Sequence, residues 1–348
     1  MTSKENYLRA VRFERPDYIP MAFAVNPACY AAYPQEEIFE LLESHPLLFP
    51  DYKRPELPYT PEYASVARKD EPYRDDFGCV WTTTMDGITG TVTGHPLADW
   101  ADFDGYVPPD PDRCTGIGPI DWEQVKRDIA ASPDALHMGG LRHGHTFLQL
   151  CDLRGYQNLM FDMADEEPRL WKLIEMVENF NMGIIRHYLD CGAEVMTYAE
   201  DLGMQVGPML SPDHFRKYIK PSYQRLMRPA REAGLPIHMH SDGDIRTLAD
   251  DLIDGGVDIL NLQDLVNGID WIADRFRGKV CIDLDIDRQS VTRFGTPADI
   301  DALIREEVSS IGVKEGGLTM IYGWYPGIPL ENARALMDAM ERYMGYFR

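Results

Sequence analysis

The sequence predicts an α/β fold, a (β/α)8 TIM barrel, from three observations. Short apolar runs that end in small or polar residues alternate with helical patterns, which is typical of a parallel sheet with helical crossovers. The length of 348 residues lies within the range of one large barrel. No Gly-x-Gly-x-x-Gly follows any apolar run, which disfavours a doubly wound open sheet, the main alternative.

The strands expected from these runs share one form, an apolar stretch closed by a small or polar residue. They are residues 19–24 (IPMAFA), 135–140 (ALHMGG), 194–199 (EVMTYA), 235–240 (LPIHMH), 258–262 (DILNL), 279–284 (KVCIDL) and 318–323 (LTMIYG). An eighth strand, needed to close the barrel, is expected between Val80 and Val92.

The helices between these runs show apolar residues at the 3, 4, 7 spacing of a buried face. One is predicted from Pro168, which tolerates a first-turn position, to Gly192, a residue typical just beyond a helix end. Another begins at Ser211 and runs towards Ala233, and Pro221 is expected to kink or divide it. A methionine-rich stripe over 330–344 predicts the last helix.

The sequence predicts a single domain over residues 1–348. Residues 45–120 are rich in Pro, Asp and Tyr and interrupt the alternation of strands and helices. We interpret this stretch as an extended N-terminal excursion that decorates the first half of the barrel.

Composition narrows the classes of partner. Lys and Arg number 34 against 57 Asp and Glu, a net charge of −23, and an acidic surface repels both nucleic acid and anionic lipid. No apolar run approaches the roughly 18 residues of a membrane span, and the polar start is unlike a signal peptide, so a cytoplasmic location is expected. The six cysteines form no Cys-x-x-Cys pair and are interpreted as reduced, mostly buried thiols.

Polar residues gather where successive predicted strands end. The chain reads Tyr-Ala-Glu-Asp at 198–201, His-Ser-Asp at 240–242, Asn-Leu-Gln-Asp at 261–264, Asp-Leu-Asp at 283–285 and Tyr-Gly-Trp at 322–324. Active sites of (β/α)8 barrels lie at the C-terminal ends of the strands. The coincidence therefore predicts a catalytic mouth.

His240 and Asp242 are the leading candidates at this mouth. With one residue between them they can turn towards a common point, and either Glu200 or Asp201 can supply a third donor from the neighbouring strand. A metal site, an acid–base pair and a hydrogen-bonded turn are all consistent with this spacing.

Other histidines carry weaker signals. His238 points to the same side of its strand as His240, as an interior histidine or as part of the pocket. His143 and His145 have metal-like spacing but lie in a loop ahead of a helix, and we interpret them as structural.

Several stretches together resemble the uroporphyrinogen decarboxylase (URO-D) superfamily, especially its decarboxylase-like, cobalamin-associated methyltransferase branch. They are ENYLRAVRFERPDYIP, EDLGMQVGPMLSPDHFRKYIKP, HSDGDI, GGVDILNLQD and GIPLENARAL. The resemblance spans most of the chain and implies a (β/α)8 barrel, a homodimer and a site at the C-terminal mouth.

Two departures from the superfamily shape the functional hypothesis. True uroporphyrinogen decarboxylases hold a polyanionic substrate with an Arg-rich segment, but the corresponding MAFAVNPACYAAYPQ contains no arginine. The thiol methyltransferases bind zinc through His-x-Cys and a later Cys, whereas this chain has His240-Ser241-Asp242 and no cysteine near Gly323 and Trp324. A harder His and carboxylate set suits an oxygen- or nitrogen-bearing substrate better than a thiol.

The resemblance therefore implies methyl transfer between a small methoxy or methylamino compound and a corrinoid carried by a partner protein. His240, Asp242 and Glu200 would hold a metal, zinc by analogy, with His240, Asp242 and Asp201 as the catalytic residues. The substrate-binding residues expected from the strand ends are Tyr198, His238, Gln263, Asp285 and Trp324. The alternatives are a non-porphyrin decarboxylase or lyase that uses His240 and Asp242 as acid and base, uroporphyrinogen decarboxylase itself, and a binding protein without turnover.

Overall fold

The computed structural model describes residues 1–348 and divides them into two compact units. Unit 1 contains residues 1–72, 82–90 and 263–348, and unit 2 contains residues 73–81 and 91–262. The prediction of a single domain stays a prediction.

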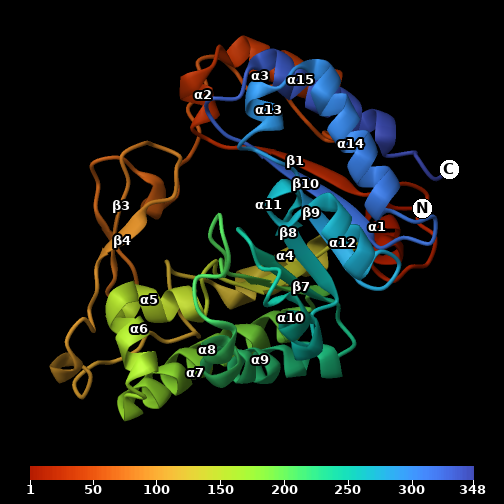
Figure 1. The fold of residues 1–348 in the computed structure, drawn as a ribbon. Helices are drawn as coiled ribbons and strands as arrows, with labels where there is room; N and C mark the ends of the chain where they lie inside the picture. The colour runs from red at the N-terminus through yellow and green to blue at the C-terminus, as the bar shows by residue number, and fades with distance from the viewer. The chain divides into compact units, whose positions relative to one another are not determined.

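Unit 1 brings the two ends of the chain together around parallel strands in the order β1-β10-β9. Figure 1 shows β1 and β10, from opposite ends of the chain, running side by side, with Phe23 opposite Tyr322. The strands of unit 1 are β1 (Met21–Val25), β9 (Cys281–Asp285) and β10 (Leu318–Trp324). Its helices are α1 (Ser3–Val11), α2 (Cys29–Ala32), α3 (Gln35–Ser44), η1 (Ser65–Ala67), α11 (Asp264–Asn267), α12 (Ile269–Phe276), α13 (Val291–Phe294), α14 (Pro297–Ile311) and α15 (Leu330–Tyr343).

Unit 2 contains parallel strands in the order β5-β6-β7-β8. These strands are β5 (Met138–Leu141), β6 (Val195–Ala199), β7 (Ile237–Ser241) and β8 (Ile259–Gln263), whose last residue begins a segment of unit 1. The helices are η2 (Trp100–Asp102), α4 (Trp122–Ala131), α5 (Phe147–Arg154), α6 (Tyr156–Ala164), α7 (Pro168–Cys191), α8 (Pro212–His214), η3 (Phe215–Ile219), α9 (Lys220–Glu232) and α10 (Ala249–Gly255). Helices α7 and α9 pack together and contact β5 and β7 respectively.

All seven predicted parallel strands are present, but the predicted eighth is wrong. Residues 80–92 instead contribute β3 (Val80–Thr82) and the start of β4 (Thr91–Gly94) to a separate three-stranded sheet, in which β2 (Tyr73–Arg74) pairs antiparallel with β3. These strands are short and half-exposed, so their apolar residues reflect a small hairpin rather than a buried barrel strand. The chain is a mixed α/β protein with parallel strands of the kind that (β/α)8 folds use.

The predicted boundaries of α7 and the predicted division of the helix after Ser211 are confirmed. Helix α7 begins at Pro168 and ends before Gly192, whose φ of 95° is the left-handed conformation that favours glycine. The helix predicted after Ser211 is divided as expected, because a π-helical turn, η3, precedes Pro221, which has no N–H to donate. No helix of the chain combines the length and the apolar character needed to cross a membrane.

Candidate metal centre

The strands β6 and β7 divide their side chains between two faces of the sheet in unit 2. On β6, Met196 and Tyr198 are buried while Thr197 and Ala199 are half-exposed, and on β7 His238 and His240 are half-exposed. This alternation is the period of two that a pleated strand imposes. Ala199 is paired in register with His240, so the residues two further along, Asp201 and Asp242, leave the same end of the sheet on the same face.

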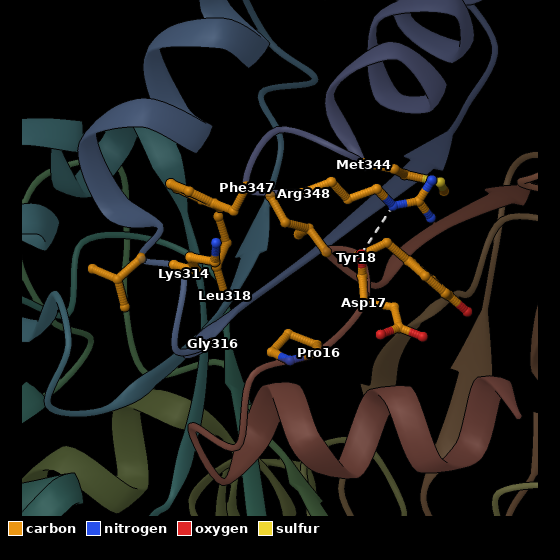
Figure 2. A pocket seen from close by; sticks show the side chains of 11 residues that line it. Pro16, Asp17, Tyr18, Lys314, Gly316, Leu318, Met344, Phe347 and Arg348 are labelled. Carbon is orange, nitrogen blue, oxygen red and sulfur yellow. Dashed lines mark hydrogen bonds between the residues drawn. The ribbon is translucent and has the colours of Figure 1, made fainter. Parts of the chain in front are cut away.

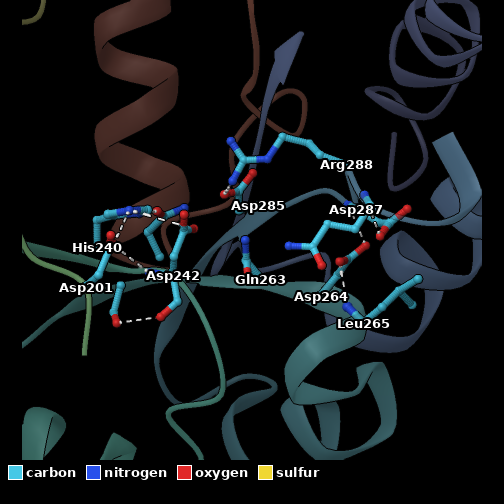
Figure 3. A network of polar contacts seen from close by, with 12 residues as sticks. Asp201, His240, Asp242, Gln263, Asp264, Leu265, Asp285, Asp287 and Arg288 are labelled. Carbon is cyan, nitrogen blue, oxygen red and sulfur yellow. Dashed lines mark hydrogen bonds and ion pairs between the residues drawn. The ribbon is translucent and has the colours of Figure 1, made fainter. Parts of the chain in front are cut away.

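His143, Asp201 and His240 form the candidate metal cluster. Their ligand atoms all lie within 4.8 Å of one another. Both imidazoles approach the same oxygen, because Asp201 Oδ1 is 3.2 Å from His143 Nε2 and 3.4 Å from His240 Nε2. Figure 3 shows His240 and Asp201 converging in this way, with Asp242 beside them.

Asn261 on β8 fixes the orientation of the His240 ring. It is paired in register with His240, and its Oδ1 accepts a hydrogen bond from His240 Nδ1. Nε2 is the atom that faces Asp201: in the protonated ring it donates to the carboxylate, and in the neutral ring with the proton on Nδ1 it presents its lone pair. Asn261 therefore selects the tautomer that a metal ligand requires.

The charges of the cluster are strongly coupled. Burial alone would raise the pKa of Asp201, but the hydrogen bonds from His143 and His240 outweigh it and hold the pKa well below its usual value. Burial alone would lower the pKa of His240, but the carboxylates of Asp201 and Asp242, together with Asn261, raise it to about 9. The cluster thus attracts one positive charge, and a proton or a metal cation can supply it.

The chemistry of the donors and the two separations from Asp201 fit a divalent cation such as zinc. Two ligands that each lie about 2.0–2.1 Å from a tetrahedral ion are about 3.3–3.4 Å apart, close to the separations from Asp201 to the two histidines. Two imidazoles and one carboxylate also leave a coordination position open, as catalytic zinc sites do.

Asp242 lies at the edge of this cluster. Its Oδ1 is 3.9 Å from His240 Nε2, further than Asp201, and its side chain is 39% exposed. The predicted pairing of His240 with Asp242 is thus present in space, with Asp201 as the closer carboxylate.

A close contact between two loop glycines holds Asp201 and Asp242 together. A Cβ on Gly203 would lie 2.5 Å from the backbone of Gly243, which has a φ of 80°. Buried Ser241 accepts a hydrogen bond from the Leu202 N–H, and the Asp242 N–H donates to Asp201 Oδ1. These bonds tie the loops after β6 and β7 to each other without bulky side chains.

Glu200 and Tyr198, two of the predicted site residues, lie on the opposite face from the cluster. Glu200 is fully buried and accepts hydrogen bonds from the Thr146 and Leu148 N–H groups and from the Tyr223 hydroxyl. Tyr198 is also fully buried and donates to the Leu226 carbonyl of α9. Of the two carboxylates considered as third donor, the structure brings Asp201 to His240 and not Glu200.

The remaining predicted site residues fall into two groups. His238 lies on the same face of β7 as His240. Gln263, Asp285 and Trp324 belong to unit 1. The Arg288 guanidinium donates a 2.8 Å hydrogen bond to Asp285 Oδ2 (Figure 3), and Trp324 is fully buried. Their roles in binding a substrate stay predictions.

Sequence reasoning noted the metal-like spacing of His143 but interpreted it as structural, and it gave Asn261 no role of its own. His143 lies after β5, and the position after a strand was the available signal, but its distance along the chain from Asp201 concealed the pairing. Asn261 stands at the predicted end of a strand, where it was noted only as an amide.

A cavity in unit 1 is separate from the predicted site residues. It measures about 20 Å³ and is lined by Tyr18, Leu318, Met344 and Phe347 among others (Figure 2). This volume accommodates little more than a single water molecule, so the cavity is not a substrate site.

The fold and the cluster define the class: an α/β protein with parallel strands and a candidate metal centre where three of them, β5, β6 and β7, end. The chain belongs to the uroporphyrinogen decarboxylase (URO-D) family, whose model matches residues 80–343. This confirms the family that the sequence resembles.

Individual relatives are distant. Uroporphyrinogen decarboxylases from two strains of Thermus thermophilus are 28% and 27% identical over 184 residues, which is 50% of this chain and 49% of theirs. The chain thus spans about half the length of these curated relatives. A methyltransferase from Methanosarcina mazei has a similar fold, with a TM-score of 0.65 and 18% identity over 99% of both chains.

Proposed function

We propose that the chain is a methyltransferase that moves a methyl group between a small methoxy or methylamino compound and a corrinoid carried by a partner protein. The observation that supports it most directly is the His143–Asp201–His240 cluster, whose donors suit a metal that binds oxygen or nitrogen. The family and the fold of the Methanosarcina mazei methyltransferase are consistent with this chemistry.

The reaction breaks the bond between the methyl carbon and its oxygen or nitrogen. Reduced cobalt supplies the electron pair of the new cobalt–carbon bond, and the heteroatom leaves with the pair of the old bond and takes up a proton. A bound metal would act as a Lewis acid on this heteroatom and so lower the cost of the departing charge.

Each residue of the cluster has a separate task in this scheme. His143 and His240 supply neutral nitrogen donors, and Asn261 keeps the proton of His240 on Nδ1. Asp201 supplies the negative oxygen between them. Asp242, which is more exposed than Asp201 and lies outside the cluster, is the carboxylate we assign to proton delivery to the leaving heteroatom.

The surroundings of the cluster argue against a substrate with many carboxylates. The arginine beside it, Arg142, is 4% exposed and already contacts Asp75 and Asp152, so it is not available to a substrate. Decarboxylation of a porphyrinogen needs several such cations.

A second candidate is a non-porphyrin decarboxylase or lyase in which His240 and Asp242 act as acid and base. It is supported by the contact of His240 Nε2 with two carboxylates, at 3.4 and 3.9 Å, since such contacts also orient a catalytic histidine. This reaction would proceed without a corrinoid and would withstand chelators.

The test is to measure the metal content of the purified protein and then mix it with cob(I)alamin and methoxy or methylamino compounds. We expect about one metal per chain and a corrinoid spectrum that shifts to the methylated form, with both lost in His240→Ala. Turnover without corrinoid would favour the lyase, and a metal-free protein with unchanged activity in His240→Ala would end the proposal. The homodimer and the cytoplasmic location remain predictions from the sequence.

A further inference from the structure

Glu200 lies directly beside Asp201 in the chain but takes part in a different set of contacts. Its Oε1 accepts hydrogen bonds of 2.9 Å from the Thr146 N–H and 2.8 Å from the Leu148 N–H, and its Oε2 accepts one from the Tyr223 hydroxyl. The carboxyl group is fully buried. These hydrogen bonds offset the cost of burying the carboxyl group, which would be large without them.

The two N–H groups lie at the start of α5, where Thr146 is the residue before the helix and Leu148 is in its first turn, and the helix has no side-chain cap of its own. A helix leaves its first N–H groups without partners in the helix, and the residue before it usually supplies a side-chain acceptor. Thr146 stands at that position, but its side chain makes no capping bond and its Oγ1 contacts His145 Nδ1 at 2.7 Å. Glu200 supplies the missing acceptor from another part of the chain.

The start of α5 is also the end of the short loop that carries His143. Only Gly144 and His145 separate His143 from Thr146, and the Gly144 N–H is held by the Ala199 carbonyl at 2.7 Å. Both anchors of the loop therefore come from the two residues that precede Asp201. The segment that precedes Asp201 therefore also holds the loop of His143, the histidine that faces Asp201.

We propose that Glu200 is a positioning residue that holds His143 against Asp201 by capping α5, and not a ligand of the metal. This inference rests on the proposed metal site. A histidine on an unanchored loop must lose conformational freedom when it binds a metal, so loss of the cap weakens metal binding.

The test compares three variants of the full chain by zinc competition with a chelator. Glu200→Leu keeps the volume but removes both acceptors, and we expect it to lower zinc affinity at least about tenfold. Glu200→Gln keeps an oxygen for the two N–H groups and should stay within about threefold of the parent. Tyr223→Phe, the matched control, removes only the contact with Oε2 and should also stay within about threefold.

Amide hydrogen exchange at residues 143–148 supplies a readout that does not need metal. We expect Glu200→Leu to speed exchange at Thr146 and Leu148, and Glu200→Gln to leave it slow. Parent-like zinc affinity in Glu200→Leu would overturn the inference, as would an equal loss in Glu200→Gln, which would indicate a ligand. If the parent binds no zinc, the proposed metal site fails, and unchanged exchange in Glu200→Leu would then separately overturn the inference.

Discussion

Two polar clusters in unit 2 contain adjacent residues, Arg142 and His143, yet they are built in opposite ways. Asp75 and Asp152 enclose Arg142, which contacts them at 3.4 and 2.8 Å, and all three side chains are buried or nearly so. Asp201 instead faces two imidazoles, and the His143, Asp201 and His240 side chains are 50%, 30% and 21% exposed. Arg142 and His143 are adjacent, so one short segment serves both clusters.

The two clusters differ in whether the cationic side chain can lose its proton. An arginine keeps its proton at all ordinary pH values and has no lone pair to offer, so its cluster is complete and can only stabilise the fold. A histidine can lose its proton and then present a lone pair to a metal. Asp75, Asp152 and Arg142 therefore form a structural brace, whereas Asp201 and the two histidines form a candidate binding site.

Replacing His240 with alanine should produce the largest change. We expect zinc affinity to fall at least about a thousandfold, more than loss of an outer partner usually causes, because a direct donor disappears. Methyl transfer should disappear with it while circular dichroism stays unchanged. Chelator competition measures the affinity, and a parent-like value would remove His240 from the metal site.

Replacing Asp75 with alanine should act on stability instead. Asp75 accepts hydrogen bonds from the Cys79 N–H and from Trp81 Nε1 as well as contacting Arg142, and its side chain is fully buried. We expect a loss of about 3 kcal/mol in the free energy of unfolding, measured in denaturant, because buried partners are left unpaired. Exposed Asp134→Asn is the control, with a change within about 0.5 kcal/mol.

The stability that the brace of Asp75, Asp152 and Arg142 confers should also depend on pH, because Asp152 titrates. Burial raises the pKa of Asp152 to about 6 from its ordinary 3.8, with Arg142 opposing the shift and Asp75 adding to it. Between these pH values the native state holds a proton that the unfolded state has released. The contribution of Asp152 to the free energy of unfolding is therefore complete below about pH 4 and is lost as the pH rises to about 6. We expect the parent to lose about 2 kcal/mol over this range relative to Asp152→Asn. A constant difference between the two proteins from pH 4 to pH 7 would contradict this.

The smallest effect should come from Asn261. Asn261→Leu removes the acceptor for His240 Nδ1, and we expect zinc affinity to fall about tenfold. Asn261→Asp keeps the acceptor and adds a negative charge, so its affinity should equal or exceed that of the parent. An equal loss in both variants would show that Asn261 acts by packing rather than by orienting His240.

Much of the fold was predictable because its signals are local. The Pro168 and Gly192 boundaries of α7 and the apolar runs of the parallel strands depend on residues close in the chain. The prediction of an eighth barrel strand was wrong because the apolar residues between Val80 and Val92 belong to a short hairpin. The sequence pattern does not distinguish such a hairpin from a barrel strand.

The site was only half predictable for a physical reason. His240 and Asp201 follow from the ends of neighbouring strands, but β6 is buried on one face and half-buried on the other, so its composition does not reveal which of Glu200 and Asp201 faces His240. The register of Ala199 with His240 settles that question, and it is a property of pairing. His143 approaches Asp201 from 58 residues away, a proximity that no local pattern encodes.

The measurement that tests the account most directly is a zinc titration of His143→Ala beside the parent chain and Asp242→Asn. We expect one zinc per chain in the parent, a loss of at least about a hundredfold in affinity in His143→Ala, and near-parent binding in Asp242→Asn, whose carboxylate lies outside the cluster. Parent-like affinity in His143→Ala, or no zinc bound by the parent, would contradict the metal centre.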